Sequence, residues 1–193
     1  TVYLFSLTEK ILGAVTMELF QGQENLCSRQ QEIELLAADQ WSGLLFMPEI
    51  IAAFATPNLP CISQVLREAS AFLEIWSKSP SFTGYQTRNP NHVKLQMAAI
   101  YEALRKKNIA YMNPPATYES VGQRIRLPHV VLGQKQGTCL DLSLLYGACL
   151  EAAGLFPLLL FIQGHAFCGC WLEEETFADC VTDDMSAIEK RTA

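Results

Sequence analysis

The sequence has no long hydrophobic segment and no basic cluster. Its longest strongly apolar stretch runs from Leu155 to Ile162, far shorter than the ~20 residues that a helix needs to cross a bilayer. The net charge is −6 and the densest basic pair is Lys106-Lys107, whereas phosphate backbones are bound by clustered positive charge. The sequence therefore predicts neither a membrane span nor direct contact with nucleic acid.

Internal repeats, low-complexity tracts and blocks of like charge are also missing, which argues against solenoid and disordered chains. Of the 193 residues, 50% are apolar and 18% are charged, a composition typical of one globular core with a small accessory unit. The seven cysteines are an odd number, lie mostly in apolar runs and form no Cys-x-x-Cys pair. We therefore expect free thiols in a reducing compartment and a cytoplasmic location.

The first part of the chain has the alternating pattern of β-strands. Short alternating segments cover residues 1–7, 14–20 and 32–37 and predict strands that are too few to bury a sheet alone. We interpret residues 1–43 as the end of a β-rich module and residues 44–193 as a second domain. Because the chain starts at threonine and ends within a predicted helix, we expect it to have been cut from a larger protein.

Apolar residues follow helical spacing from residue 47 onward. The pattern predicts a short helix over residues 47–54 and longer helices over residues 60–78 and 91–107, the last with Asn91 as its N-cap. An extended connection over residues 113–128 is expected to follow, because that segment is rich in turn-forming residues.

The second half of the chain predicts one more long helix followed by strands. Thr138 and Asp141 have the spacing of an N-cap and an acid in the first helical turn, and Gly154 ends the helix predicted over residues 139–153. Apolar runs over residues 156–162, 165–172 and 177–181 then predict an antiparallel meander, and residues 185–191 a final helix. This order is typical of an α+β fold.

Cys139 stands at the first position of that helix. Free backbone N–H groups and the positive end of the helix dipole lower the pKa of a thiol there, and the same N–H groups can face an oxyanion. Cys139 is therefore a candidate nucleophile, although a single cysteine is more often a small buried hydrophobe.

His165 is the candidate general base, because it heads a predicted core strand that closely follows the cysteine helix. The alternative is a core histidine whose hydrogen bonds are satisfied. His92 opens an exposed helix and His129 follows a proline in a predicted loop. Both are interpreted as surface residues.

Asp183 is the candidate third residue. A hairpin centred near Glu174 would place residue 183 opposite His165. Asp184 would then point to the other face, and Asp179 would pair farther along the strand. The alternative interpretation is that Asp183 and Asp184 cap the helix that follows.

The chain order of these residues resembles the transglutaminase-like fold, which is related to papain-like cysteine proteases. A closer resemblance covers about three quarters of the chain and is to a segment of large bacterial multidomain proteins that also carry a helicase and a nuclease-like region. It is carried by Met47-Pro-Glu-Ile-Ile-Ala-Ala-Phe, Asn113-Pro-Pro-Ala, Gly122-Gln-Arg-Ile-Arg-Leu-Pro, Gly137-Thr-Cys-Leu-Asp and Gly164-His-Ala-Phe.

The resemblance implies that Cys139 is the nucleophile, His165 the base and Asp183 the orienting acid of a cofactor-free cysteine hydrolase. Its chemistry would be acyl transfer through a thioester, with hydrolysis of a peptide or isopeptide bond favoured over cross-linking. A protein or peptide would be the substrate, and other domains of the same polypeptide would be its partners.

Two departures from the family concern aromatic residues. Phe167 stands where familiar transglutaminases have tryptophan, and no obvious tryptophan is available for the oxyanion side. Gln123 could supply a side-chain amide donor, with Gln134 and Gln136 as alternatives.

The same residues allow two other interpretations. A zinc site built from His165, Cys168, Cys170 and Cys180 is disfavoured, because His165 and Cys168 would point to opposite faces of one strand. A catalytically inactive module that binds proteins or peptides is the stronger rival, since a fold alone does not define an activity.

Overall fold

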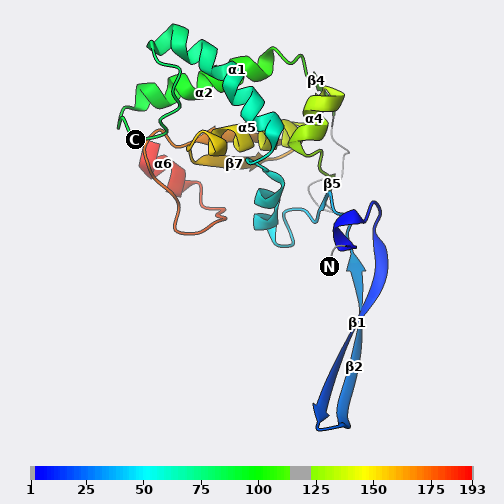
Figure 1. Cartoon of the computed structure of the whole chain (residues 1–193). Coiled ribbons are helices and arrows are strands. Elements are labelled where there is room, and N and C mark those ends of the chain that lie inside the picture. The colour runs from blue at the N-terminus through cyan, green and yellow to red at the C-terminus, as the bar shows by residue number, and fades with distance from the viewer. Residues whose placement is uncertain (1–2, 114–122, 193) are drawn as a thin grey trace.

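The computed structural model describes residues 3–113 and 123–192, and its N-terminal part is a long β-hairpin (Figure 1). Strands β1 (Ile11–Gln21) and β2 (Glu24–Leu35) pair antiparallel from Ile11↔Leu35 to Gln21↔Glu24. Nearly every residue of the hairpin is exposed, and Figure 1 shows it extending away from the helices. The strand predicted over residues 14–20 is confirmed within β1.

Other expectations for this region were wrong. Residues 4–6 form the 3-10 helix η1 (Leu4–Ser6) instead of a strand. Strand β2 begins eight residues earlier than expected, at Glu24, directly after the turn at Gly22, whose φ is +64°. The sequence pattern missed its first half because a ribbon exposed on both faces needs no apolar alternation.

Three helices form the main core. Helices α1 (Pro60–Ser77), α2 (Pro90–Arg105) and α5 (Cys139–Ala152) bury apolar faces against one another, which confirms the three long helices predicted from the sequence. The largest fully buried side chains of this core are Ile62, Val65, Leu73, Ile100, Leu145, Leu150 and Leu155.

The structure corrects three details around these helices. The segment predicted as a short α-helix is the 3-10 helix η2 (Pro48–Phe54), which starts after Met47 in a left-handed conformation. The N-cap of α2 is Asn89, whose side chain accepts a hydrogen bond from the Asn91 N–H, so Asn91 is not the cap. A helix also begins where the extended connection was expected to end, namely α4 (Pro128–Gln134); residues 114–122 of that connection lie outside the described residues.

Two very short sheets join distant segments beside the start of α5. Strand β3 (Gln40–Trp41) pairs antiparallel with β5 (Gln123–Arg124). Strand β4 (Ala110–Tyr111) pairs parallel with β6 (Gln136–Gly137), which directly precedes the helix. None of these four strands was predicted, because a two-residue strand leaves no periodic pattern in the sequence.

The strands after α5 form a hairpin instead of a three-stranded meander. Strands β7 (Pro157–Ile162) and β8 (His165–Cys170) pair antiparallel, as predicted. Residues 177–181 form no strand, so the third predicted strand was wrong. Phe177 packs edge-on against Trp171 at a centroid distance of 5.1 Å, and this contact holds the chain near the end of β8. The last helix is α6 (Ser186–Thr192).

The arrangement confirms an α+β architecture. Trp41, close to the predicted boundary at residue 43, is fully buried and pairs with Gln123 of β5. Within residues 3–113 and 123–192, no helix combines the length and the apolar character needed to cross a membrane.

The buried hydrogen bonds of Gln96 give a testable prediction about the stability of the core. Gln96 is fully buried in α2, its Oε1 accepts from the N–H groups of Thr83 and Gly84 at 2.9 and 3.0 Å, and its Nε2 donates to the Gly84 carbonyl at 3.0 Å. Gln96→Met is expected to lower the free energy of unfolding by about 3 kcal/mol, because buried backbone groups lose their partners. Urea denaturation measures it.

The matched control is Gln64→Met on the exposed face of α1, which should change stability by less than about 0.5 kcal/mol. Equal effects of the two substitutions would contradict this account of the Gln96 hydrogen bonds.

Candidate active site

Cys139 occupies the first position of α5, as the sequence predicted. The Thr138 hydroxyl accepts a hydrogen bond from the Asp141 N–H at 3.3 Å, and the Asp141 carboxylate accepts one from the Thr138 N–H at 2.9 Å. This reciprocal capping box leaves the N–H groups of Cys139 and Leu140 without an intrahelical acceptor, since the first turn of a helix has none. The thiol therefore stands where a helix can stabilise negative charge.

The Asp141 side chain also attaches a second segment to the start of α5. It is fully buried, and its two oxygens accept hydrogen bonds from the backbone N–H of Arg126 at 2.9 Å and from its guanidinium at 3.1 Å. Arg126 follows β5 by two residues. The same carboxylate therefore determines both the first turn of α5 and the position of the segment that carries Gln123.

A small apolar cluster surrounds the thiol. Cys139 is only 4% exposed, and it shares this cluster with Trp41 from β3 and Ala166 from β8. The Trp41 ring packs on Phe161 of β7 at a centroid distance of 5.6 Å. Three separate parts of the chain thus meet at the head of α5.

Two buried polar side chains in this region have no hydrogen-bond partner among the described residues. They are Gln123, through both atoms of its amide, and Trp41, through its indole Nε1. Gln123 is 6% exposed and Trp41 is 0% exposed, and the two residues face each other as a cross-strand pair. Unsatisfied buried polar groups are costly, so a bound group that exchanges hydrogen bonds with them would stabilise this site.

The position of Gln123 separates it from the two other glutamines considered above. Gln136 donates its side-chain amide to the Oε1 of Gln134 at 3.3 Å, and that bond is exposed. Only Gln123 among the three is a buried amide beside the Cys139 cluster. Its role as an oxyanion donor remains a prediction.

The backbone of His165 in β8 lies near that of Cys139 in α5, but the His165 side chain points away from α5. Ala166 points towards α5, whereas the exposed His165 ring stacks with Phe167 at 6.4 Å on the opposite face of the hairpin. The described structure has no hydrogen bond between His165 and Cys139. The structure therefore brings the two residues into neighbouring elements without joining their side chains.

Ser143 connects those neighbouring elements. Its buried hydroxyl lies 2.7 Å from the Cys139 carbonyl and 3.2 Å from the Ala166 carbonyl, and it is the donor to both. One hydroxyl group thus connects the backbone of Cys139, the candidate nucleophile, with that of Ala166, which follows His165.

The hairpin argument for Asp183 was wrong. The partner of His165 in the sheet is Ile162, and no strand passes opposite β8 in the described residues after it. Asp183 is exposed. The alternative interpretation is confirmed for its neighbour, since the Asp184 carboxylate accepts from the Ser186 N–H at 3.0 Å, where α6 begins. Asp183 as the orienting acid remains a prediction without this register to support it.

Tyr111 was not singled out by the sequence. Desolvation, together with the nearby Cys139 thiol, raises the pKa of the Tyr111 phenol. No local pattern marks this tyrosine, because β4 and β6 come together only through tertiary pairing. The same holds for Trp41, whose buried indole comes from the two-residue strand β3.

The remaining cysteines differ strongly in accessibility. Burial raises the pKa of Cys149 and of Cys168 to about 12, and it also raises the pKa of Cys170. Cys27 and Cys180 are exposed, and all seven cysteines are free thiols. Within the described residues, no group of three or more His, Cys, Asp or Glu side chains is placed to hold a metal ion.

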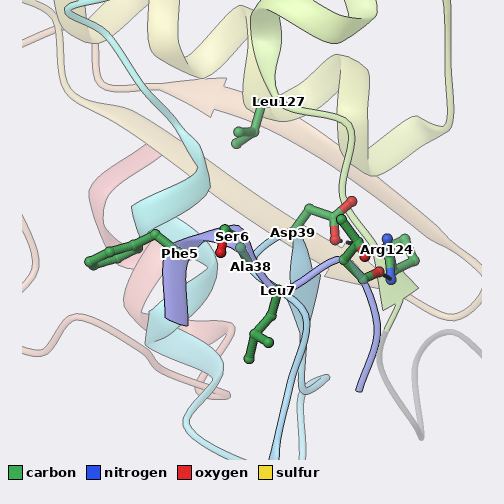
Figure 2. A pocket seen from close by; sticks show the side chains of 8 residues that line it. Phe5, Ser6, Leu7, Ala38, Asp39, Arg124 and Leu127 are labelled. Atoms are coloured by element: carbon green, nitrogen blue, oxygen red, sulfur yellow. Dashed lines mark hydrogen bonds and ion pairs between the residues drawn. The ribbon is translucent and has the colours of Figure 1, made fainter. Parts of the chain in front are cut away.

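A separate pocket of about 280 Å³ lies next to β5. Figure 2 shows that the N-terminal segment around Leu7 lies beside Asp39 and Arg124 there. Arg124 donates to the Thr8 carbonyl at 2.7 Å and pairs with Asp39 at 2.9 Å. Since strand residues alternate in direction, Arg124 lies on the opposite side of β5 from Gln123. The pocket borders the cysteine cluster through Leu127, which lines the pocket and packs against the cluster.

Comparison with known proteins gives little further information. No protein-family model matches the chain, and no curated protein matches it. A solved structure from Parabacteroides distasonis, described as a candidate protease, is similar at 16% identity with a TM-score of 0.31. The match covers 79% of this chain and 31% of that one, so this chain spans about a third of the length of its structural neighbour.

The capping network of α5 can be tested through Asp141. Asp141→Ala is expected to lower the free energy of unfolding by about 3–5 kcal/mol, because it leaves the buried end of Arg126 and the Thr138 N–H without their acceptor. Thermal or urea unfolding measures the loss.

Asp184→Ala is the control, since that exposed aspartate caps only the start of α6. It should cost about 1 kcal/mol or less. A loss at Asp141 as small as that at Asp184 would show that the network at α5 is not important for stability.

Proposed function

We propose that the chain is a cysteine-dependent acyl-transfer or hydrolytic module that uses Cys139 as its nucleophile. The observation that supports this proposal most directly is the position of Cys139. It begins a capped helix and shares one cluster with Trp41, the cross-strand partner of Gln123. Both Trp41 and Gln123 carry buried hydrogen-bonding groups that have no partner among the described residues. Such groups can stabilise an oxyanion formed on a substrate carbonyl.

The proposed reaction passes through a thioester. His165 removes the Cys139 proton while Sγ bonds to the carbonyl carbon, and the oxyanion forms beside Gln123 and the first-turn N–H groups of α5. The carbon–nitrogen bond then breaks as His165 protonates the leaving amine. Water then attacks the thioester carbon and gives one proton to His165. The carbon–sulfur bond breaks, the carboxylic acid leaves, and His165 returns its proton to the Cys139 thiolate.

The proposal requires His165 to turn from the outer face of the hairpin towards Cys139. It is exposed at the first position of β8, after the turn residue Gly164, whose φ is +75°. The next residue, Ala166, is linked to Cys139 through the Ser143 hydroxyl, which bonds the backbone carbonyls of both residues. A change of the backbone at the Gly164 turn, together with rotation of the imidazole away from Phe167, is therefore part of the proposal.

The wider context follows from the resemblance in the sequence. We propose a protein or peptide amide as the substrate, a cytoplasmic location, and a position within a larger bacterial multidomain protein, with residues 1–43 belonging to a β-rich module. Peptide or isopeptide hydrolysis is favoured over cross-linking, because no amine-binding site is recognised in the sequence.

A second candidate function is a non-catalytic module that binds proteins or peptides. Its support is that His165 and Cys139 share no hydrogen bond in the described structure and that Cys139 is 4% exposed. Acylation of the thiol distinguishes the two functions.

Cys139 should be acylated by an activated ester such as p-nitrophenyl acetate, read as nitrophenolate release and as a mass increase on the Cys139 peptide. Cys149 should remain unmodified at pH 7–8, because its pKa of about 12 keeps the thiol protonated. His165→Ala is expected to slow acylation about 100-fold or more, the usual contribution of a general base.

His129→Ala is the matched control, since that exposed histidine lies on α4 and should leave the rate unchanged. If Cys139 reacted no faster than the exposed Cys27, or if the two histidine variants behaved alike, the enzyme proposal would be lost in favour of the binding module.

A further inference from the structure

One edge of the N-terminal hairpin is open along its whole length (Figure 1). Strand β1 is hydrogen-bonded to β2 on one side, and within the described residues it has no other strand neighbour. Backbone groups of alternate residues in an antiparallel strand point to opposite edges, so about half of those in β1 point away from β2. Every residue of β1 except Gly13 is exposed. A two-stranded ribbon alone is at best marginally stable in water, so a further strand on this edge would stabilise it.

The sequence of β1 does not protect this edge. Natural edge strands are often short, or carry proline, lysine or other charged residues that prevent pairing with another chain. Strand β1 has 11 residues, contains neither proline nor lysine, and has Glu18 as its one charged residue. Strand β2 carries charges at four positions, namely Glu24, Arg29, Glu32 and Glu34. The edge of β1 is therefore the one at which the hairpin can pair.

Two large apolar side chains of β1 lie at equal distances from its centre. Leu12 is 80% exposed and Phe20 is 54% exposed. Both have even numbers, so they point to the same face of the strand, and Thr16 lies midway between them. The bulge near Phe20 is in β2, where the pairing moves from Cys27 to Asn25, so the alternation along β1 is not interrupted. A two-fold axis at Thr16 would therefore bring each Leu12 opposite a Phe20.

We propose that β1 pairs antiparallel with β1 of a second copy of this chain, about a two-fold axis at Thr16. The two hairpins then form one four-stranded sheet in the order β2–β1–β1–β2. All of β1 is paired, since Ile11 of one copy lies opposite Gln21 of the other. Leu12 contacts Phe20 across the new pair of strands. Cross-strand contacts of aromatic side chains stabilise a sheet, and a two-fold interface contains each contact twice.

Charge and strand length select this register. The axis at Thr16 places Glu18 opposite Ala14 of the other copy, so the two carboxylates do not face each other. An axis at Glu18 would set them directly opposite each other, which is destabilising. An axis at Ala14 would leave Phe20 beyond the paired strands. In the proposed register, the other face of the joined sheet gathers apolar side chains from both copies, namely Ile11, Val15, Met17 and Leu19.

Engineered disulfides test the arrangement in a Cys27→Ser, Cys180→Ser background, which removes the exposed thiols. Thr16→Cys should form a covalent dimer with oxidised glutathione, because directly opposite residues have Cα atoms about 4.5–5.5 Å apart, within the range of a disulfide. Gln30→Cys is the matched control. Gln30 is the partner of Thr16 in β2, and three strand spacings would separate its two copies by about 14 Å. Non-reducing electrophoresis measures both variants.

Sedimentation of the full chain measures the dimer without engineered cysteines. Leu12→Lys removes both contacts with Phe20 and is expected to weaken dimerisation about tenfold. Leu26→Lys is its control, because Leu26 is 50% exposed at the bulge of the outer strand β2 and should leave the dissociation constant unchanged. Circular dichroism verifies that both variants are folded.

A chain that stays monomeric at high micromolar concentration overturns the inference, and this is the result expected if a different protein covers the edge. Equal cross-linking at Thr16→Cys and Gln30→Cys also overturns it, since random collision would then explain both. A dimer that Leu12→Lys leaves intact, or that Leu26→Lys weakens as much, would form through another surface and overturns the pairing of β1. None of these measurements uses the reactivity of Cys139, so the inference and the proposed function can fail separately.

Discussion

The buried carboxylate of Asp141 accepts three hydrogen bonds, one from Thr138 and two from Arg126. A charge without solvent is tolerated only when such partners satisfy it. Because Thr138 caps α5 and Arg126 follows β5, satisfying this one group joins the helix to a segment from elsewhere in the chain. The positions of Cys139 and of Gln123 both depend on that connection.

The apolar character of α5 has a second consequence. Its sides are buried by α1, α2 and the β7–β8 hairpin, and its first residues, Cys139 to Asp141, are buried as well. Ser143, one turn after Cys139 in the same helix, holds the hairpin next to Cys139 by hydrogen bonds to the Cys139 and Ala166 carbonyls. Packing and site geometry are thus determined by the same element.

Elements stabilised by residues close together in the sequence could be predicted, and elements that depend on distant residues could not. Helix α5, its capping box and the strands after it were predicted well, because caps and apolar periodicity act over a few residues. The third strand of the meander was not, since Phe177 packs on Trp171 instead of extending along β8. The register that placed Asp183 opposite His165 failed with that strand.

By itself, the sequence determined the α+β class, the free thiols and the position of Cys139 at the start of a capped helix, since each follows from composition or from neighbours along the chain. Only the tertiary structure decided which side chains surround that thiol. Trp41 joins its cluster from the two-residue strand β3, and Tyr111 and Gln123 lie on the two-residue strands β4 and β5. The pairing of these strands is set by long-range packing and leaves no periodic pattern. The direction of the His165 ring was likewise decided by the face of β8 that packs on α5.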